Sequence, residues 1–120
     1  MIDHVGFEVS DLRGCIRFYD AVFFALGARR MFESEQAVAY GINTSLIWFS
    51  ARGLSPGAGY GHLALQASGK AAVDAAYAAG LANGGSDDGP PGQRPQYGRR
   101  YYAAYLRDPD RLRVEVVSRR

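Results

Sequence analysis

The chain has 120 residues, of which 48% are hydrophobic and 22% are charged, the size and balance of one compact domain with an ordinary core. This composition excludes a long disordered chain, and no apolar run reaches the roughly 18 residues of a membrane span. The net charge is only +2, and the basic residues are scattered rather than aligned on one helix face, so we expect no nucleic-acid partner.

The N-terminal residues and the cysteine content indicate where the protein works. Met1-Ile2-Asp3-His4 lacks a basic segment followed by an apolar one, so no secretory signal is predicted and we expect a cytoplasmic protein without a membrane partner. Cys15 is the only cysteine, which excludes an internal disulfide or a cysteine-based zinc site. Its apolar spacing in a predicted helix indicates packing.

The sequence contains an internal repeat. The segment HVGFEVS at 4–10 is followed 58 positions later by HLALQAS at 62–68, with histidine on histidine and serine on serine. Further pairs at the same offset are Tyr19 with Tyr77, Ala21 with Ala79, and Gly27 with Gly85. The repeat therefore predicts two related modules.

The first module, about residues 1–52, is predicted as strand, helix and three strands. It begins with apolar residues at alternate positions, which is typical of a half-buried strand. A helix follows, with Ser10 or Asp11 as its N-cap and Gly27 as a left-handed C-cap. Three short strands are then predicted at about 29–34, 37–41 and 45–51.

The second module, about residues 60–120, follows the same plan with a longer connection. Ser68 is predicted to cap its helix, which stops at Gly84-Gly85. The Gly- and Pro-rich stretch 84–98 should hold the weakest strand, and it either borders a site or is a surface excursion. Its polar residues include Arg94, Gln96, Tyr97 and Arg99. Strands at 101–107 and 112–118 are joined by a type I turn, Asp108-Pro109-Asp110-Arg111.

Strand alternation places the only two histidines on equivalent faces. The apolar residues that alternate with His4 and His62 should pack under the helices, so each histidine points away from its helix. On the last strand, Glu115 shares the open face with Arg113 and Val117. Three potential ligands therefore face one cavity.

Short segments spread over nearly the whole chain carry a family resemblance. They are Ile2-Asp3-His4-Val5, Val9-Ser10-Asp11-Leu12, Phe18-Tyr19-Asp20, Gly61-His62, and Tyr105-Leu106-Arg107-Asp108-Pro109-Asp110 leading to Val114-Glu115-Val116. In this order they resemble the vicinal oxygen chelate superfamily, which includes glyoxalase I, extradiol dioxygenases, fosfomycin-resistance transferases and bleomycin-binding proteins. The resemblance implies a single α+β domain over 1–120, in which two βαβββ modules form a cup-shaped mixed sheet with the helices on the outside.

The resemblance also implies a metal site. Carried over residue by residue, its ligands are His4, His62 and Glu115. The fourth position of the glyoxalase I pattern falls on Ile47, which is not a ligand, so the resemblance to glyoxalase I itself is incomplete. Two histidines and one carboxylate suit Fe, Mn, Zn or Ni and leave coordination positions open for a substrate with adjacent oxygens.

Further residues are candidates for orienting substrate or transferring a proton. Glu8 shares the face of the histidines, and Tyr101 and Tyr105 share one face of their strand. Packing is the alternative for the tyrosines, and an ion pair with Arg113 or Arg111 is the alternative for Glu115.

The turn before the last strand departs from the family pattern. A glycine usually follows Asp-Pro-Asp, and Arg111 stands there in this chain. If that position has positive φ, we expect a local cost of about 1 kcal/mol.

Two functions remain open. The first is a divalent-metal-dependent lyase, isomerase or dioxygenase acting on a small molecule with adjacent oxygens. The second is a metal-free protein that binds a small molecule or drug, as bleomycin-resistance proteins do. The slightly basic charge favours the first, since a cationic drug would need an acidic groove.

We expect a homodimer under either function. The two modules pair either within a chain or by exchange between chains, and in the exchanged form His4 joins His62 and Glu115 of the partner subunit.

Overall fold

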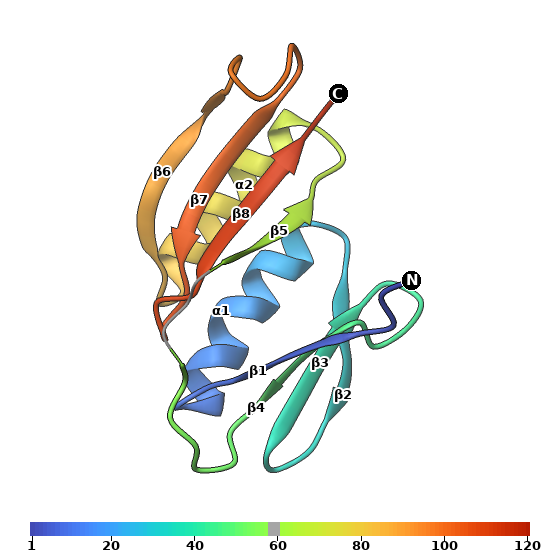
Figure 1. Cartoon of the computed structure of the whole chain (residues 1–120), viewed down its shortest axis with the longest axis vertical. Helices are drawn as coiled ribbons and strands as arrows, with labels where there is room; N and C mark the ends of the chain where they lie inside the picture. The colour runs from blue at the N-terminus through green and yellow to red at the C-terminus, as the bar shows by residue number, and fades with distance from the viewer. Residues whose placement is uncertain (58–60) are drawn as a thin grey trace.

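A computed structural model describes residues 1–57 and 61–120 (Figure 1). The first module consists of β1 (Val5–Glu8), α1 (Leu12–Ala25), β2 (Arg29–Glu33), β3 (Ala37–Gly41) and β4 (Ile47–Ser50). The second consists of β5 (His62–Gln66), α2 (Lys70–Ala82), β6 (Ser86–Gln93), β7 (Tyr102–Arg107) and β8 (Arg113–Ser118). The α+β class and the two βαβββ modules are therefore confirmed. The expected start of the second module, at about residue 60, lies outside the described residues.

Each module forms a four-stranded mixed sheet of its own. The strand orders are β1-β4-β3-β2 and β5-β8-β7-β6, and β1 and β5 run parallel to their single neighbours. Both strands are thus sheet edges, and the two sheets occupy opposite halves of the molecule in Figure 1. No pairing joins β1 to β5 within the described ranges, so one chain does not close the two sheets into one continuous cup.

One hydrophobic core unites the modules through their helices. Phe18 and Val22 of α1 and Val73 of α2 are fully buried in the same cluster as Val114 of β8. Close packing explains a glycine in α2: a Cβ at Gly80 would lie 2.9 Å from Leu106 Cδ1 and 3.1 Å from Phe18 Cε1. Each helix covers one face of its sheet and leaves the other face for the polar residues.

The helix ends follow the predictions in one module and depart from them in the other. Asp11 caps α1, since its side chain accepts hydrogen bonds from the N–H groups of Arg13 and Gly14. Gly27 has the predicted left-handed conformation, with φ +82°. The N-cap of α2 is Gly69 and has no side-chain hydrogen bond, so the prediction that Ser68 caps this helix is wrong. The helix begins one residue later than that cap requires.

The predicted turn between β7 and β8 is confirmed and ties the modules together. The Arg111 N–H donates to Asp108 O at 2.8 Å, and Arg111 has φ 71°, the strained conformation expected of this position. The Asp108 carboxylate accepts from the N–H groups of Asp110 and Leu112 at 2.8 and 2.9 Å. Its other oxygen accepts from Tyr19 Oη of α1 at 2.7 Å.

The strand expected inside the Gly- and Pro-rich stretch is β6, which spans eight residues. It contains Pro90 and Pro91 and stands at a sheet edge, where a missing N–H is tolerated, and its register against β7 shifts twice. Cys15 is 2% exposed in the core, and burial raises the pKa of its thiol. Within the ranges 1–57 and 61–120, no helix has both the length and the apolar character needed to cross a membrane.

Candidate functional site

His62, Glu115 and the two candidate tyrosines lie on the face of the second sheet that α2 leaves open. Along β8, Val114 and Val116 belong to the core beneath the helices, whereas Val117 packs with Tyr105 in a small separate cluster on the opposite face. Glu115 shares that face, because successive strand residues alternate in direction. The predicted alternation is therefore correct for the last strand.

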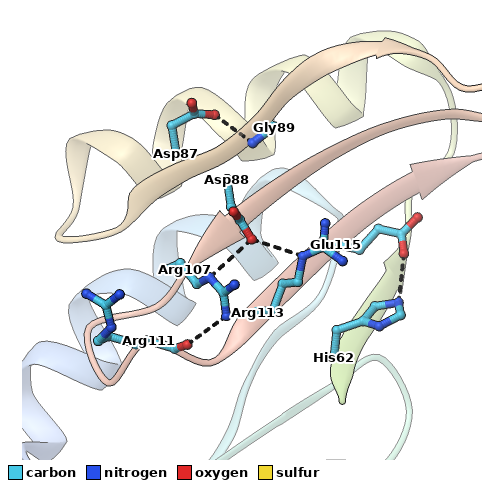
Figure 2. A network of polar contacts seen from close by, with 8 residues as sticks. All are labelled: His62, Asp87, Asp88, Gly89, Arg107, Arg111, Arg113 and Glu115. Atoms are coloured by element: carbon cyan, nitrogen blue, oxygen red, sulfur yellow. Dashed lines mark hydrogen bonds and ion pairs between the residues drawn. The ribbon is translucent and has the colours of Figure 1, made fainter. Parts of the chain in front are cut away.

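Glu115 is held by His62 of β5 and by Tyr101, the residue before β7. Only 2% of Glu115 is exposed, and its Oε1 lies 3.0 Å from His62 Nε2, a contact drawn in Figure 2. Tyr101 Oη donates a hydrogen bond to the other oxygen, Oε2. The ion pair with Arg113 or Arg111, considered above as the alternative for Glu115, is not formed: Arg113 Nε donates to Asp88 at 2.9 Å. Each carboxylate oxygen thus has its own partner.

Both tyrosines lie beside this carboxylate, and Tyr101 donates a hydrogen bond to it. Burial, reinforced by the hydrogen bond to Glu115, raises the pKa of Tyr101 to about 12. Burial and the charge of Glu115, its cross-strand partner, also raise the pKa of Tyr105. Both phenols stay protonated near neutral pH. Tyr102 faces the other way and packs against the core.

His4 lies apart from the other predicted ligands within one chain. It precedes the edge strand β1, its side chain is 57% exposed, and its Nδ1 lies 2.6 Å from Asp3 Oδ1. Among the residues that the structure describes, no three His, Cys, Asp or Glu side chains of one chain lie close enough to hold a metal ion. One chain therefore brings together His62 and Glu115 of the predicted triad, and not His4.

Glu8 borders a cavity shared by both modules. This cavity, of about 710 Å³, is lined by β1 residues including Glu8, by His62 of β5, and by the Asp108 turn. Arg52 Nε donates to Glu8 Oε1 at 2.7 Å, while Oε2 is buried and has no hydrogen-bond partner in the described part of the chain. Glu8 is therefore held by Arg52 at the wall of the cavity that His62 also lines.

The first-module counterpart of Glu115 is Trp48, and the assignment to Ile47 is wrong. In the sheets, Gly6 is paired with Trp48 and Ala64 with Glu115, and Gly6 and Ala64 are themselves related by the 58-residue repeat. Ile47 points into the core with 6% exposure, because a shift of one residue turns a strand side chain to the opposite face. Tryptophan is not a ligand, so the fourth metal-binding position is still unfilled.

The Gly- and Pro-rich stretch borders this site. Arg94 lies over the ring of Tyr105, with its Cζ 5.5 Å from the ring centroid, and the ring of Tyr97 lies 5.4 Å from that of Tyr101. Gln96 and Arg99 are exposed. Two of its four polar residues singled out in the sequence thus contact the tyrosines beside Glu115.

The paired modules and the polar sheet face define a class of protein, and comparisons with known proteins agree. Residues 1–116 match the Glyoxalase/Bleomycin resistance protein/Dioxygenase superfamily, and the chain belongs to this family. A glyoxalase/bleomycin resistance protein from Albidiferax ferrireducens T118 is 31% identical, with 98% of each chain covered and a TM-score of 0.87.

More distant structures share the fold. Lactoylglutathione lyase from Agrobacterium tumefaciens is 23% identical, with 98% of this chain and 92% of that chain covered and a TM-score of 0.71. The fosfomycin resistance protein FosX from Listeria monocytogenes is 21% identical, with coverages of 96% and 89% and a TM-score of 0.71. A search of curated protein sequences finds no match.

Proposed function

We propose that the chain is a divalent-metal-dependent enzyme, of the lyase, isomerase or dioxygenase type, acting on a small substrate with adjacent oxygen atoms. The observation that carries this proposal is the 3.0 Å separation of His62 Nε2 and Glu115 Oε1. At this separation an imidazole nitrogen and a carboxylate oxygen would be close enough to bind one ion together. Imidazole and carboxylate are also the donor types that Fe, Mn, Zn and Ni accept.

A second copy of the chain supplies the third ligand, His4, in this proposal. The Asp3 carboxylate beside His4 Nδ1 favours the tautomer that leaves Nε2 free to bind a metal. His4 immediately precedes the edge strand β1, and His62 begins the edge strand β5. The outer side of each strand has no partner strand among the described residues. Bringing the β1 edge of one chain beside the β5 edge of another completes a cup and places the two histidines together.

An apolar surface beside these edges supports the dimer. A second cavity of about 710 Å³ runs from β1 past the β3–β4 loop to β5. Ile2, Ile42 and Leu46, which line it, are 75%, 63% and 41% exposed. A grouping of exposed aliphatic side chains is typical of an interface.

The chain's own residues have separate tasks in the proposed reaction. The bound metal would polarise the substrate oxygens as a Lewis acid. Tyr101 fixes one oxygen of Glu115 and directs the other toward His62. Glu8, with one oxygen held by Arg52, lines the cavity that His62 also lines and is the candidate to orient the substrate or accept a proton from it.

Metal content tests the proposal directly. Protein purified without chelator or nickel affinity should contain near-stoichiometric metal by elemental mass spectrometry. His62→Ala and Glu115→Ala should lose it, and Glu35→Ala, a change at an exposed turn residue, should retain it. Circular dichroism and the melting temperature report whether each variant is folded. A folded wild type that takes up no Fe(II), Mn(II), Zn(II) or Ni(II) contradicts the metal-dependent enzyme.

Mixing variants tests whether the site is shared between chains. His4→Ala and Glu115→Ala should each lack metal, but a heterodimer formed by refolding them together has one intact site. Because about half of the randomly mixed dimers are heterodimers, metal content should recover to about one quarter of the wild-type value. No recovery in a mixture shown by mass spectrometry to contain heterodimers contradicts the exchanged arrangement.

A metal-free binding protein is the second candidate, and an aromatic surface favours it. The rings of Trp48 and Phe32 lie 5.1 Å apart on the first sheet, and Phe32 is 43% exposed. Stacking on such a surface needs no metal. Trp48 is the only tryptophan, so a planar ligand should quench its fluorescence, equally in wild type and in Glu115→Ala if the metal is not required.

A further inference from the structure

Arginines gather around the two tyrosines beside Glu115. The guanidinium carbon of Arg113 lies 4.1 Å from the centre of the Tyr105 ring, and that of Arg94 lies 5.5 Å from the same centre. Arg119 lies 4.8 Å from the centre of the Tyr101 ring. These cations cover the aromatic part of the same sheet face that carries His62 and Glu115.

Carboxylates do not balance this positive charge. Asp88 is shared by Arg113 and Arg107, whose Nε atoms lie 2.9 and 3.1 Å from Asp88 Oδ2, as Figure 2 shows. Arg94 and Arg119 form no ion pair with any residue in the described part of the chain. Glu115 is already engaged by His62 and Tyr101. The face therefore has a surplus of positive charge although the whole chain carries only +2.

Among these arginines, Arg113 is the one best placed to bind an anion. It is paired with His62 in the register of β8 and β5, so the two residues begin neighbouring strands side by side. Its Nε is fixed by Asp88 and its plane lies over Tyr105, while its terminal amino groups make no hydrogen bond to a described residue. Its side chain is 37% exposed. A fixed guanidinium with free amino groups suits two-point binding of a planar or tetrahedral oxyanion.

We propose that Arg113 binds an anionic group, a carboxylate or a phosphonate, of the substrate. This inference rests on the proposed function, because it places that anion beside the metal held by His62 and Glu115. Arg113 is a specificity residue in this scheme: it selects charged substrates over neutral ones with the same adjacent oxygens. Arg94 and Arg119 add to the positive electrostatic potential around the anion without contacting it.

The competing explanation is that Arg113 only anchors Asp88 on β6. Arg107 provides the matched control, because it contacts the same Asp88 oxygen and also donates a hydrogen bond to Arg111 O at 3.3 Å. A purely structural role predicts similar effects of Arg113→Ala and Arg107→Ala. A binding role predicts an effect of Arg113→Ala alone.

The experiment measures binding of three small probes by isothermal titration calorimetry. Glycolate and hydroxymethylphosphonate carry adjacent oxygens with a negative charge, and ethylene glycol is the neutral counterpart. Each probe is titrated into Mn(II)-loaded and metal-free protein, and the metal content and melting temperature of each variant are recorded. Arg113→Ala should weaken binding of an anionic probe by about 10- to 100-fold, with the metal content unchanged. Arg113→Lys should recover part of the affinity, because lysine restores the positive charge but not the two-point hydrogen bonding of a guanidinium.

The outcomes separate the two proposals. Selective loss of glycolate binding identifies a carboxylate site, and selective loss of hydroxymethylphosphonate binding identifies a phosphonate site. Equal binding of glycolate and ethylene glycol by wild type, or equal losses in Arg113→Ala and Arg107→Ala, overturns the anion site. If wild type binds no metal, the metal-dependent function fails, and the titrations of metal-free protein still decide the role of Arg113.

Discussion

At the scale of single residues, Glu115 shows how much strand alternation can predict. The period of two places Glu115 opposite Val114 and Val116 from sequence alone, and the structure confirms that placement. A different argument, the alignment of Ser50 with Ser118 across loops of unequal length, misplaced the first-module counterpart at Ile47, because such an alignment does not determine the pairing register. Trp48 is identified by its sheet partner: Gly6 pairs with Trp48, and its repeat equivalent Ala64 pairs with Glu115. Only the sheet hydrogen bonds reveal it.

Asp108 gives a pH-dependent prediction at this scale. Burial raises the pKa of Asp108 above its ordinary 3.8, so the folded state holds this proton more tightly than the unfolded chain does. The stability that protonated Asp108 contributes is fully present below the unfolded-state pKa of 3.8 and is lost as the pH rises through the higher pKa of the folded state. Asp108→Asn cannot ionise. The free energy of unfolding of wild type relative to Asp108→Asn should therefore fall as the pH rises from about 3.8 toward neutrality.

Urea unfolding of both proteins at several pH values measures this difference. Comparing the two proteins cancels the titration of groups that they share, provided that the variant keeps its near-ultraviolet circular dichroism. A wild type that gains stability relative to Asp108→Asn on raising the pH would show that the hydrogen bonds to Asp108, and not its burial, dominate its pKa.

At the scale of elements, the β7–β8 turn was predicted well and the start of α2 was not. Asp-Pro-Asp has a local preference for a type I turn, so the residues determine the backbone with little help from the rest of the fold. A serine before a helix is a weaker signal, since Gly69 can end the extended segment equally well. Sequence alone thus predicts those segments of this fold whose residues strongly prefer one backbone conformation.

The strain at Arg111 leads to a prediction for this turn. Arg111 has φ 71°, a conformation that costs a residue with a Cβ about 1–2 kcal/mol. Arg111→Gly should raise the free energy of unfolding by up to about 1 kcal/mol, because the greater freedom of glycine in the unfolded chain offsets part of the gain. The hydrogen bond from Arg107 to Arg111 is retained, since it uses the backbone carbonyl. Gly27→Ala, at φ +82°, should show the opposite change in the same denaturation experiment.

At the scale of the whole molecule, the separation of the two sheets is the feature that the sequence did not reveal. Identical strand and helix patterns serve a cup closed within one chain and a cup closed between two chains. The ligand set could therefore be predicted as His4, His62 and Glu115 without knowing that one chain brings only the last two together. In the proposed dimer His4 would come from the second copy, and local sequence patterns do not encode such an assembly.

The edges and the apolar groove predict a dimer that one substitution weakens. Ile42→Glu places a charge on the groove beside β1 and β5, so it should raise the dimer dissociation constant by at least about tenfold. Phe24→Glu is the control, because Phe24 is 84% exposed and does not line this groove. Sedimentation velocity over a concentration series measures both. An Ile42→Glu variant that stays dimeric at the lowest concentration would place the interface elsewhere.

The pairing of Trp48 with Gly6 has a consequence for how the two halves of the chain have diverged. Trp48 stands where the repeat symmetry places Glu115, so one half now offers a flat indole where the other offers a carboxylate. In the proposed dimer of exchanged modules, every cup would then have one aromatic wall and one polar wall. Trp48→Glu would make the two walls alike. The difference between the two halves would thus orient a ligand that has one flat face and one polar end.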